Sequence, residues 1–150
     1  MSSLSHIDTL DSASGNASCS QPAPALRAFA ELAGRFLLIS LFLISGLGKI
    51  TAYSATAGYM ASAHVPGALL PLVIATEVGG SLALLLGWHT RAVSLLLAGF
   101  TFATAVLFHT NFGDQVQMIM FLKNISIVGA FLMLAANGAG PISLDARNTK

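Results

Sequence analysis

Four long apolar stretches, separated by short polar segments, make up most of the chain. They cover residues 25–50, 67–86, 91–109 and 115–136. A helix that crosses a bilayer needs about 20 mostly apolar residues, and each stretch is close to that length. In hydrocarbon only helices and closed barrels satisfy the backbone polar groups, and these runs lack the two-residue alternation of barrel strands. The pattern therefore predicts an all-α membrane protein, a bundle of four transmembrane helices.

Residues typical of turns and helix caps fall between these stretches. Pro66 precedes the second stretch, and Pro71 lies in its first turn, where a missing N–H is harmless. The four residues 87–90 leave room only for a tight turn, so the second and third helices should be antiparallel neighbours. Asp114 is a suitable N-cap for the fourth helix, and Gly138 is suited to end it.

The remaining segments are too polar to cross a membrane. Residues 1–24, rich in Ser, Ala and Thr, predict a disordered tail, and residues 138–150 form a C-terminal tail outside the transmembrane domain 25–137. Apolar residues recur at helical spacing within 51–66, which predicts a short interfacial helix between helices 1 and 2. Its tyrosines should lie at headgroup level.

The composition supports a membrane-embedded chain and excludes several classes of protein. It is 55% hydrophobic and 9% charged, whereas soluble domains are about 25% charged. The net charge of +1 gives no reason to expect nucleic acid as a partner. One cysteine, Cys19, allows no internal disulfide, CxxC pair or iron–sulfur cluster, and no metal site is predicted.

The distribution of Lys and Arg predicts the orientation. Arg27, Arg91, Arg147 and Lys150 lie on the side of the two tails, whereas the opposite side has Lys49. Because the richer side is normally cytoplasmic, both termini are expected in the cytoplasm.

Several polar side chains fall inside the spanning segments, where a central charge costs about 2.5–3.5 kcal/mol on insertion scales. Glu77 and Lys123 have opposite charges at comparable depth, so they are expected to pair or share a network. Lys49 and His109 should lie near the outer mouth of the bundle. The candidate polar core therefore consists of Glu77, Lys123, Asn124, His109 and Lys49.

Helical spacing assigns inward faces to these residues. Glu31 and Arg35 are four apart and are expected to form a structural ion pair near the cytoplasmic face. On the fourth helix the expected inward stripe is Lys123, Ser126, Ala130 and Met133. Two simpler explanations remain open: the polar residues are packing contacts between membrane helices, and Lys49 extends to the outer headgroups.

Several motifs resemble the DoxX family of bacterial inner-membrane proteins. The matching runs keep their order and spacing. They are SGLGKITAY (45–53), YMASAHVPGALLPLVIATEVGG (59–80), LALLLGWHTRA (82–92), AGFTFATAVLFHTNFGDQ (98–115) and FLKNISIVGAFLMLAANGAG (121–140). The resemblance implies a four-helix protein of the bacterial inner (plasma) membrane, with the lipid bilayer as its surroundings. The family takes its name from a subunit of an archaeal thiosulfate:quinone oxidoreductase, and other members look like partners in membrane thiol-stress complexes. The resemblance by itself assigns no catalytic role to a residue of this chain.

Two main functions agree with these observations. In the first, the protein is a quinone-linked redox subunit: His109 or Glu77 exchanges protons, and Lys123 or Asn124 holds a carbonyl. The apolar slot for the quinone ring would come from Phe108, Phe112, Met120 and Phe121. In the second, the protein is a non-enzymatic scaffold or assembly factor that docks a protein partner or a second copy. A small transporter is the least favoured alternative, because four helices are few and no inverted repeat is evident.

Overall fold

The computed structural model describes residues 23–148 and consists of helices and short connections over that range. Four of its helical segments are long and apolar enough to cross a membrane, as the sequence predicts. The elements are α1 (Pro24–Thr51), α2 (Tyr53–Ser62), the 3-10 turn η2 (Gly67–Leu69), α3 (Leu70–Leu86), α4 (Thr90–Phe108), α5 (Gln115–Asn137) and α6 (Leu144–Asn148).

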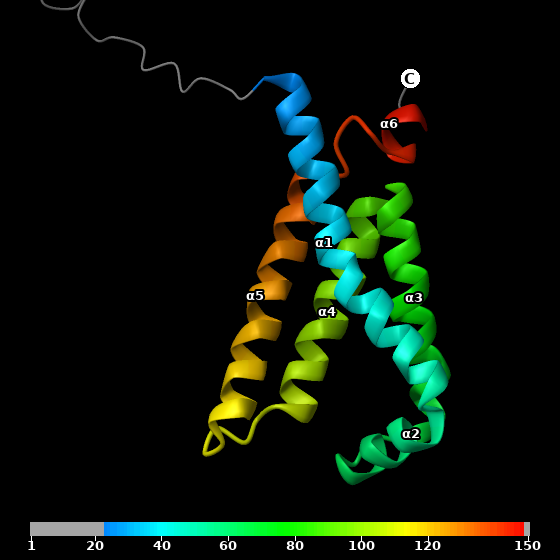
Figure 1. Cartoon of the computed structure of the whole chain (residues 1–150), viewed down its shortest axis with the longest axis vertical. Helices are drawn as coiled ribbons and strands as arrows, with labels where there is room; N and C mark the ends of the chain where they lie inside the picture. Colours follow the sequence, from blue (N-terminus) through cyan, green and yellow to red (C-terminus); the bar gives the residue numbers. More distant parts are fainter. Residues whose placement is uncertain (1–22, 149–150) are drawn as a thin grey trace, which may run out of the picture.

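The four long helices form two pairs, α1 with α3 and α4 with α5, which the α3–α4 turn joins (Figure 1). The start of α1, the α3–α4 turn and α6 lie at one end of the bundle, termed the α6 end. The α4–α5 turn and α2, the predicted short helix, lie at the other end, termed the α2 end. The two ends of the described chain therefore lie on the same side of the bundle.

The predicted turn and cap residues act as expected. Gly87 adopts a left-handed conformation (φ 65°), and the Trp88 N–H donates to the Ala83 carbonyl at 2.9 Å. This arrangement ends α3 and starts the antiparallel α4 within a few residues. At the start of α5, Asp114 Oδ1 accepts a hydrogen bond from the Val116 N–H at 2.8 Å, which confirms the predicted N-cap.

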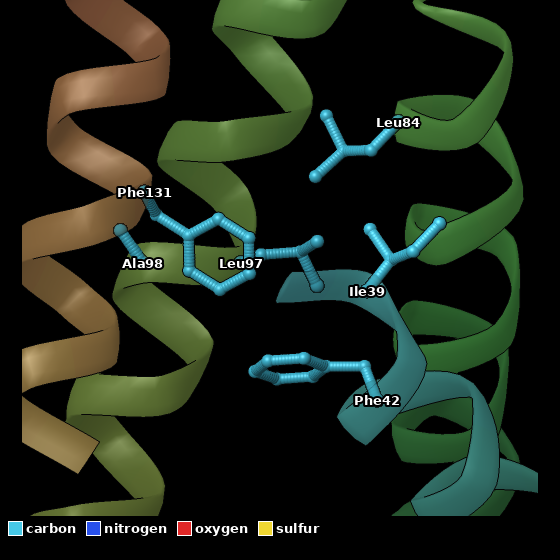
Figure 2. Packing of buried hydrophobic residues seen from close by; sticks show 6 residues of the cluster. All are labelled: Ile39, Phe42, Leu84, Leu97, Ala98 and Phe131. Carbon is cyan, nitrogen blue, oxygen red and sulfur yellow. The ribbon is translucent and has the colours of Figure 1, made fainter. Parts of the chain in front are cut away.

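All four long helices contribute to one apolar core at the middle of the bundle. Phe42 and Phe131 meet edge to face there, with ring centroids 5.2 Å apart. Figure 2 shows these rings beside the other buried members of the cluster, which are Ile39, Leu84, Leu97 and Ala98. Gly46 allows α1 to approach α3 closely, because a Cβ there would lie 2.7 Å from Val78 Cγ2.

The inward face of α5 differs from the expected one. Lys123, Ser126, Ala130 and Met133 are all exposed on the surface of the bundle. Phe131 is fully buried instead, and Ile127, Val128 and Leu134 pack against the core. The predicted stripe was therefore wrong by one residue, which is a rotation of about 100° on a helix.

The C-terminal segment is folded back onto the bundle, which the sequence reasoning did not predict. The Asp145 carboxylate accepts hydrogen bonds from the His89 and Thr90 N–H groups, both at 2.8 Å. The Asp145 N–H donates to the Gly87 carbonyl at 2.9 Å. These contacts cap the first turn of α4 and hold α6 against the α3–α4 turn. The predicted disordered tail falls almost entirely on residues 1–22, outside the described part of the chain.

Candidate functional site

A cavity of about 370 Å³ opens at the α2 end, among α1, α2, α3 and α4. Its polar wall is formed by Ser45, Lys49, Thr56, Tyr59, Thr104 and His109. Its apolar wall includes Met60, Val73, Phe100, Leu107 and Phe108. Tyr59 of α2 stacks on Phe108 of α4 with ring centroids 5.5 Å apart, so α2 closes part of this end of the bundle.

Lys49 lines this cavity and forms an ion pair with Glu77, which lies outside the cavity wall. Lys49 Nζ is 2.9 Å from Glu77 Oε1 and 2.8 Å from Glu77 Oε2, and it also donates to Ser45 Oγ at 2.6 Å. The side chain of Glu77 is 7% exposed and that of Lys49 is 23% exposed. All three ammonium donors therefore have oxygen partners, as the burial of a charged group requires.

His109 reaches the same cavity from the end of α4. Its Nδ1 lies 2.7 Å from Gln117 Oε1 at the start of α5. If Nδ1 carries the proton in that hydrogen bond, Nε2 is left as an acceptor in the neutral ring. The structure thus brings Lys49, Glu77 and His109 of the candidate polar core to one region.

Lys123 does not join that region. It lies on the exposed face of α5, and its Nζ is 3.2 Å from Met120 Sδ. Glu77 therefore pairs with Lys49 rather than with Lys123, because α3 packs directly on α1 whereas α5 packs mainly on α4. Asn124 is half-buried and is absent from the cavity wall.

The expected quinone slot is only partly assembled. Phe108 lines the cavity, but Phe112 and Phe121 pack against each other, with centroids 5.2 Å apart, outside its wall. The sequence reasoning missed the contribution of α2, although it placed Tyr59 at the membrane surface. The stacking of Tyr59 on Phe108, together with Thr56 and Met60 in the cavity wall, shows that α2 lies over the cavity.

The predicted ion pair between Glu31 and Arg35 was wrong. Glu31 Oε1 instead accepts a hydrogen bond from Arg27 Nε at 2.8 Å. Arg35 turns toward α3 and the C-terminal segment, where it donates to the Leu84 carbonyl at 3.3 Å and the Ile142 carbonyl at 2.5 Å. The guanidinium of Arg35 thereby joins α1 both to the last turn of α3 and to the segment that precedes α6.

The four-helix fold defines an integral membrane protein, and comparison with known proteins gives its family. The DoxX family profile matches residues 30–110, and the chain belongs to this family. Inner membrane protein YqjF of Escherichia coli (strain K12) is 51% identical over 114 residues, which cover 76% of this chain and 88% of the relative. Inner membrane protein YphA of the same strain is 41% identical over 123 residues, 77% and 88% of the two chains. The chain is thus a DoxX-family integral inner-membrane protein. No solved structure matches it significantly.

Proposed function

We propose that the cavity at the α2 end binds the head group of a membrane quinone, and that the protein serves as a quinone-linked subunit of a membrane oxidoreductase. The observation that carries this proposal is that Lys49, held by an ion pair with Glu77, and His109 both line one largely apolar cavity. Ligand sites of this kind combine apolar walls with a few convergent polar groups in a volume of about 300–1,000 Å³.

The three polar groups suit the two quinone carbonyls and their protons. Lys49 can donate a hydrogen bond to one carbonyl by releasing Ser45, and His109 with both ring nitrogens protonated can donate from Nε2 to the other. Reduction of a quinone to a quinol takes up two electrons and two protons. In this proposal His109 exchanges one proton directly, and Glu77 exchanges the other through Lys49, because Lys49 lines the cavity and Glu77 does not. The electrons would come from a partner protein, since one cysteine cannot hold an iron–sulfur cluster.

Equilibrium binding of a short-chain ubiquinone and a short-chain menaquinone analogue to the detergent-purified protein tests this function. Lys49→Gln and His109→Asn should each weaken binding by about tenfold, which corresponds to one lost hydrogen bond to a charged or polar partner. The Asn side chain can still reach Gln117 but removes the titratable ring. The second variant keeps the test decisive if Lys49→Gln does not fold.

The chain offers a matched control for each variant. Lys123→Gln removes an exposed lysine of the same end of the bundle, and His64→Asn removes an exposed histidine beside α2. Both should bind the analogues as the wild type does. Equal affinity in all four variants would mean that quinone merely partitions into the detergent, and it would refute the proposed function.

One observation favours the scaffold function as a second candidate. Lys123 lies on an exposed face of α5, and this helix buries only Phe131 fully within the described chain. An ammonium facing acyl chains is costly, and a protein partner or a second copy could cover it. Cross-linking from a cysteine at Ser126, in a Cys19→Ser background, should then capture a partner in membranes. A cysteine at Ile127 on the packed face is the control.

For both candidate functions we propose the same membrane orientation, in which the two termini and the α6 end face the cytoplasm. The support for it is the group of Arg27, Arg91 and Arg147 near that end.

A further inference from the structure

A second hollow, a groove of about 770 Å³, lies between α1 and α5. It belongs to the α6 end, since Arg27 lies in the first turn of α1 and Asn137 is the last residue of α5. The groove is therefore separate from the cavity at the α2 end, and a ligand bound in it would be independent of the proposed quinone.

The polarity of the groove changes along the helix axis. Arg27, Glu31 and Asn137 line it near the helix ends, whereas Leu37 and Met133 line it further along the helices. Leu37 follows Arg27 by ten residues, or about 15 Å of helix. Because these helices span the membrane, the polar part lies near headgroup depth and the apolar part lies in the hydrocarbon. A phospholipid has the same order of polarity.

The groove also carries an excess of positive charge and an unused buried donor. Arg27 and Arg35 oppose one carboxylate, that of Glu31, which leaves one net positive charge among the lining residues. Arg35 is 2% exposed, and its Nε is buried without a hydrogen-bond partner, as is the Oε2 acceptor of Glu31 in the same groove. Buried donors are nearly always satisfied, so this one points to a missing acceptor. A phosphodiester carries one negative charge, and its oxygens are strong acceptors for guanidinium groups.

We propose that this groove is a binding site for one phospholipid. The phosphodiester lies against Arg27 and the Arg35 Nε, and one acyl chain follows Leu37 and Met133. Gly34 leaves room for that chain, because a Cβ added there would meet nothing within 4 Å. A larger side chain at this position should fill the groove without disturbing the bundle.

Native mass spectrometry of the delipidated protein in detergent tests the site with three probes. Phosphatidylglycerol carries both phosphate and acyl chains, diacylglycerol lacks the phosphate, and glycerol 3-phosphate lacks the chains. We expect one phosphatidylglycerol to bind at least about tenfold more tightly than either fragment, because both halves of the groove contribute. Equal binding of diacylglycerol, or equal binding of glycerol 3-phosphate, would overturn the proposal.

Two variants locate the lipid, and each has a matched control. Arg27→Gln should weaken phosphatidylglycerol binding about tenfold, and Gly34→Leu should abolish it by occupying the acyl path. Arg91→Gln changes an exposed arginine at the same end, and Gly129→Leu changes an exposed glycine of α5 that also has open space around it. Both controls should bind normally. Retention of the lipid by Gly34→Leu, or equal losses in the controls, would show that the lipid binds elsewhere.

Discussion

Removal of one partner from the Lys49–Glu77 ion pair should destabilise the bundle strongly. Glu77 is 7% exposed, and both of its carboxylate oxygens lie within 2.9 Å of Lys49 Nζ. In Glu77→Met the ammonium would keep Ser45 as a partner but lose its counter-charge. In Lys49→Met the carboxylate would have to be buried unpaired or take up a proton.

The magnitude follows from the cost of an uncompensated buried charge. Breaking a buried pair by removing one partner costs about 3–5 kcal/mol, or a factor of at least a hundred in the unfolding equilibrium constant. Replacing both partners with apolar residues of similar volume is often neutral. The double variant Lys49→Met/Glu77→Met should therefore regain most of the stability that either single variant loses.

Equilibrium unfolding with SDS in mixed micelles, followed by circular dichroism, measures these free energies of unfolding. Lys123→Met is the control: it also removes a lysine from a spanning helix, but this ammonium has no carboxylate partner among the described residues, so no loss of stability is expected. If Glu77→Met is as stable as the wild type, or if the double variant is no more stable than the weaker single variant, the ion pair does not stabilise the bundle by charge compensation.

Three further predictions concern the ends of the bundle. Burial alone would raise the pKa of Asp145, but hydrogen bonds from the Thr90 and His89 N–H groups lower that pKa below its ordinary value of 3.8. Asp145 therefore stabilises the folded protein near neutral pH, and this stabilisation is lost as the pH falls below 3.8. Asp145→Asn should abolish this acid-dependent loss in a pH series of thermal unfolding. Asp114→Ala should cost about 1 kcal/mol by removing the α5 N-cap, whereas Asp114→Asn should cost little in the same assay. A fluorescent protein fused to the C-terminus should fluoresce in cells, and a cysteine placed within 110–114 in a Cys19→Ser background should react with an impermeant maleimide from outside. Reaction only after the membrane is broken would reverse the proposed orientation.

The spans and their punctuation could be predicted from the sequence because each depends on local chemistry. A run of about 20 apolar residues has few alternatives to a spanning helix, and Gly87 and Asp114 act through backbone groups a few residues away. The docking of α6 could not be predicted in this way. It depends on Asp145 meeting the free N–H groups at the start of α4, more than 50 residues earlier in the chain.

The rotation of α5 shows a second limit of sequence patterns in a membrane. In water a polar residue marks the outer face of a helix, and in lipid a charged residue is expected to mark the inner face. Lys123 breaks that expectation, because a lysine stem can carry its ammonium along the helix toward the membrane surface. Its contact with Met120, one turn nearer the start of α5, has this direction. The face that packs inward is set by the fit of Phe131 among Phe42 and Leu97.

Two criteria can be used to predict the ion-pair partner of Glu77, namely its depth in the membrane and the order of the helices along the chain, and they disagree. Counted along the helices, Glu77 lies about 10 Å from the start of α3 and Lys123 about 12 Å from the start of α5, so depth favours Lys123. Lys49 lies only about 3 Å from the end of α1, so depth disfavours it. Connectivity favours Lys49, because consecutive elements are usually neighbours in space. Depth is the weaker criterion, because the four-carbon stem of Lys49 and the oblique course of α1 compensate for several ångströms of difference in depth (Figure 1). A side chain cannot reach a partner across an intervening helix. In small membrane bundles, then, neighbouring helices should be tested as ion-pair partners before residues matched only in depth.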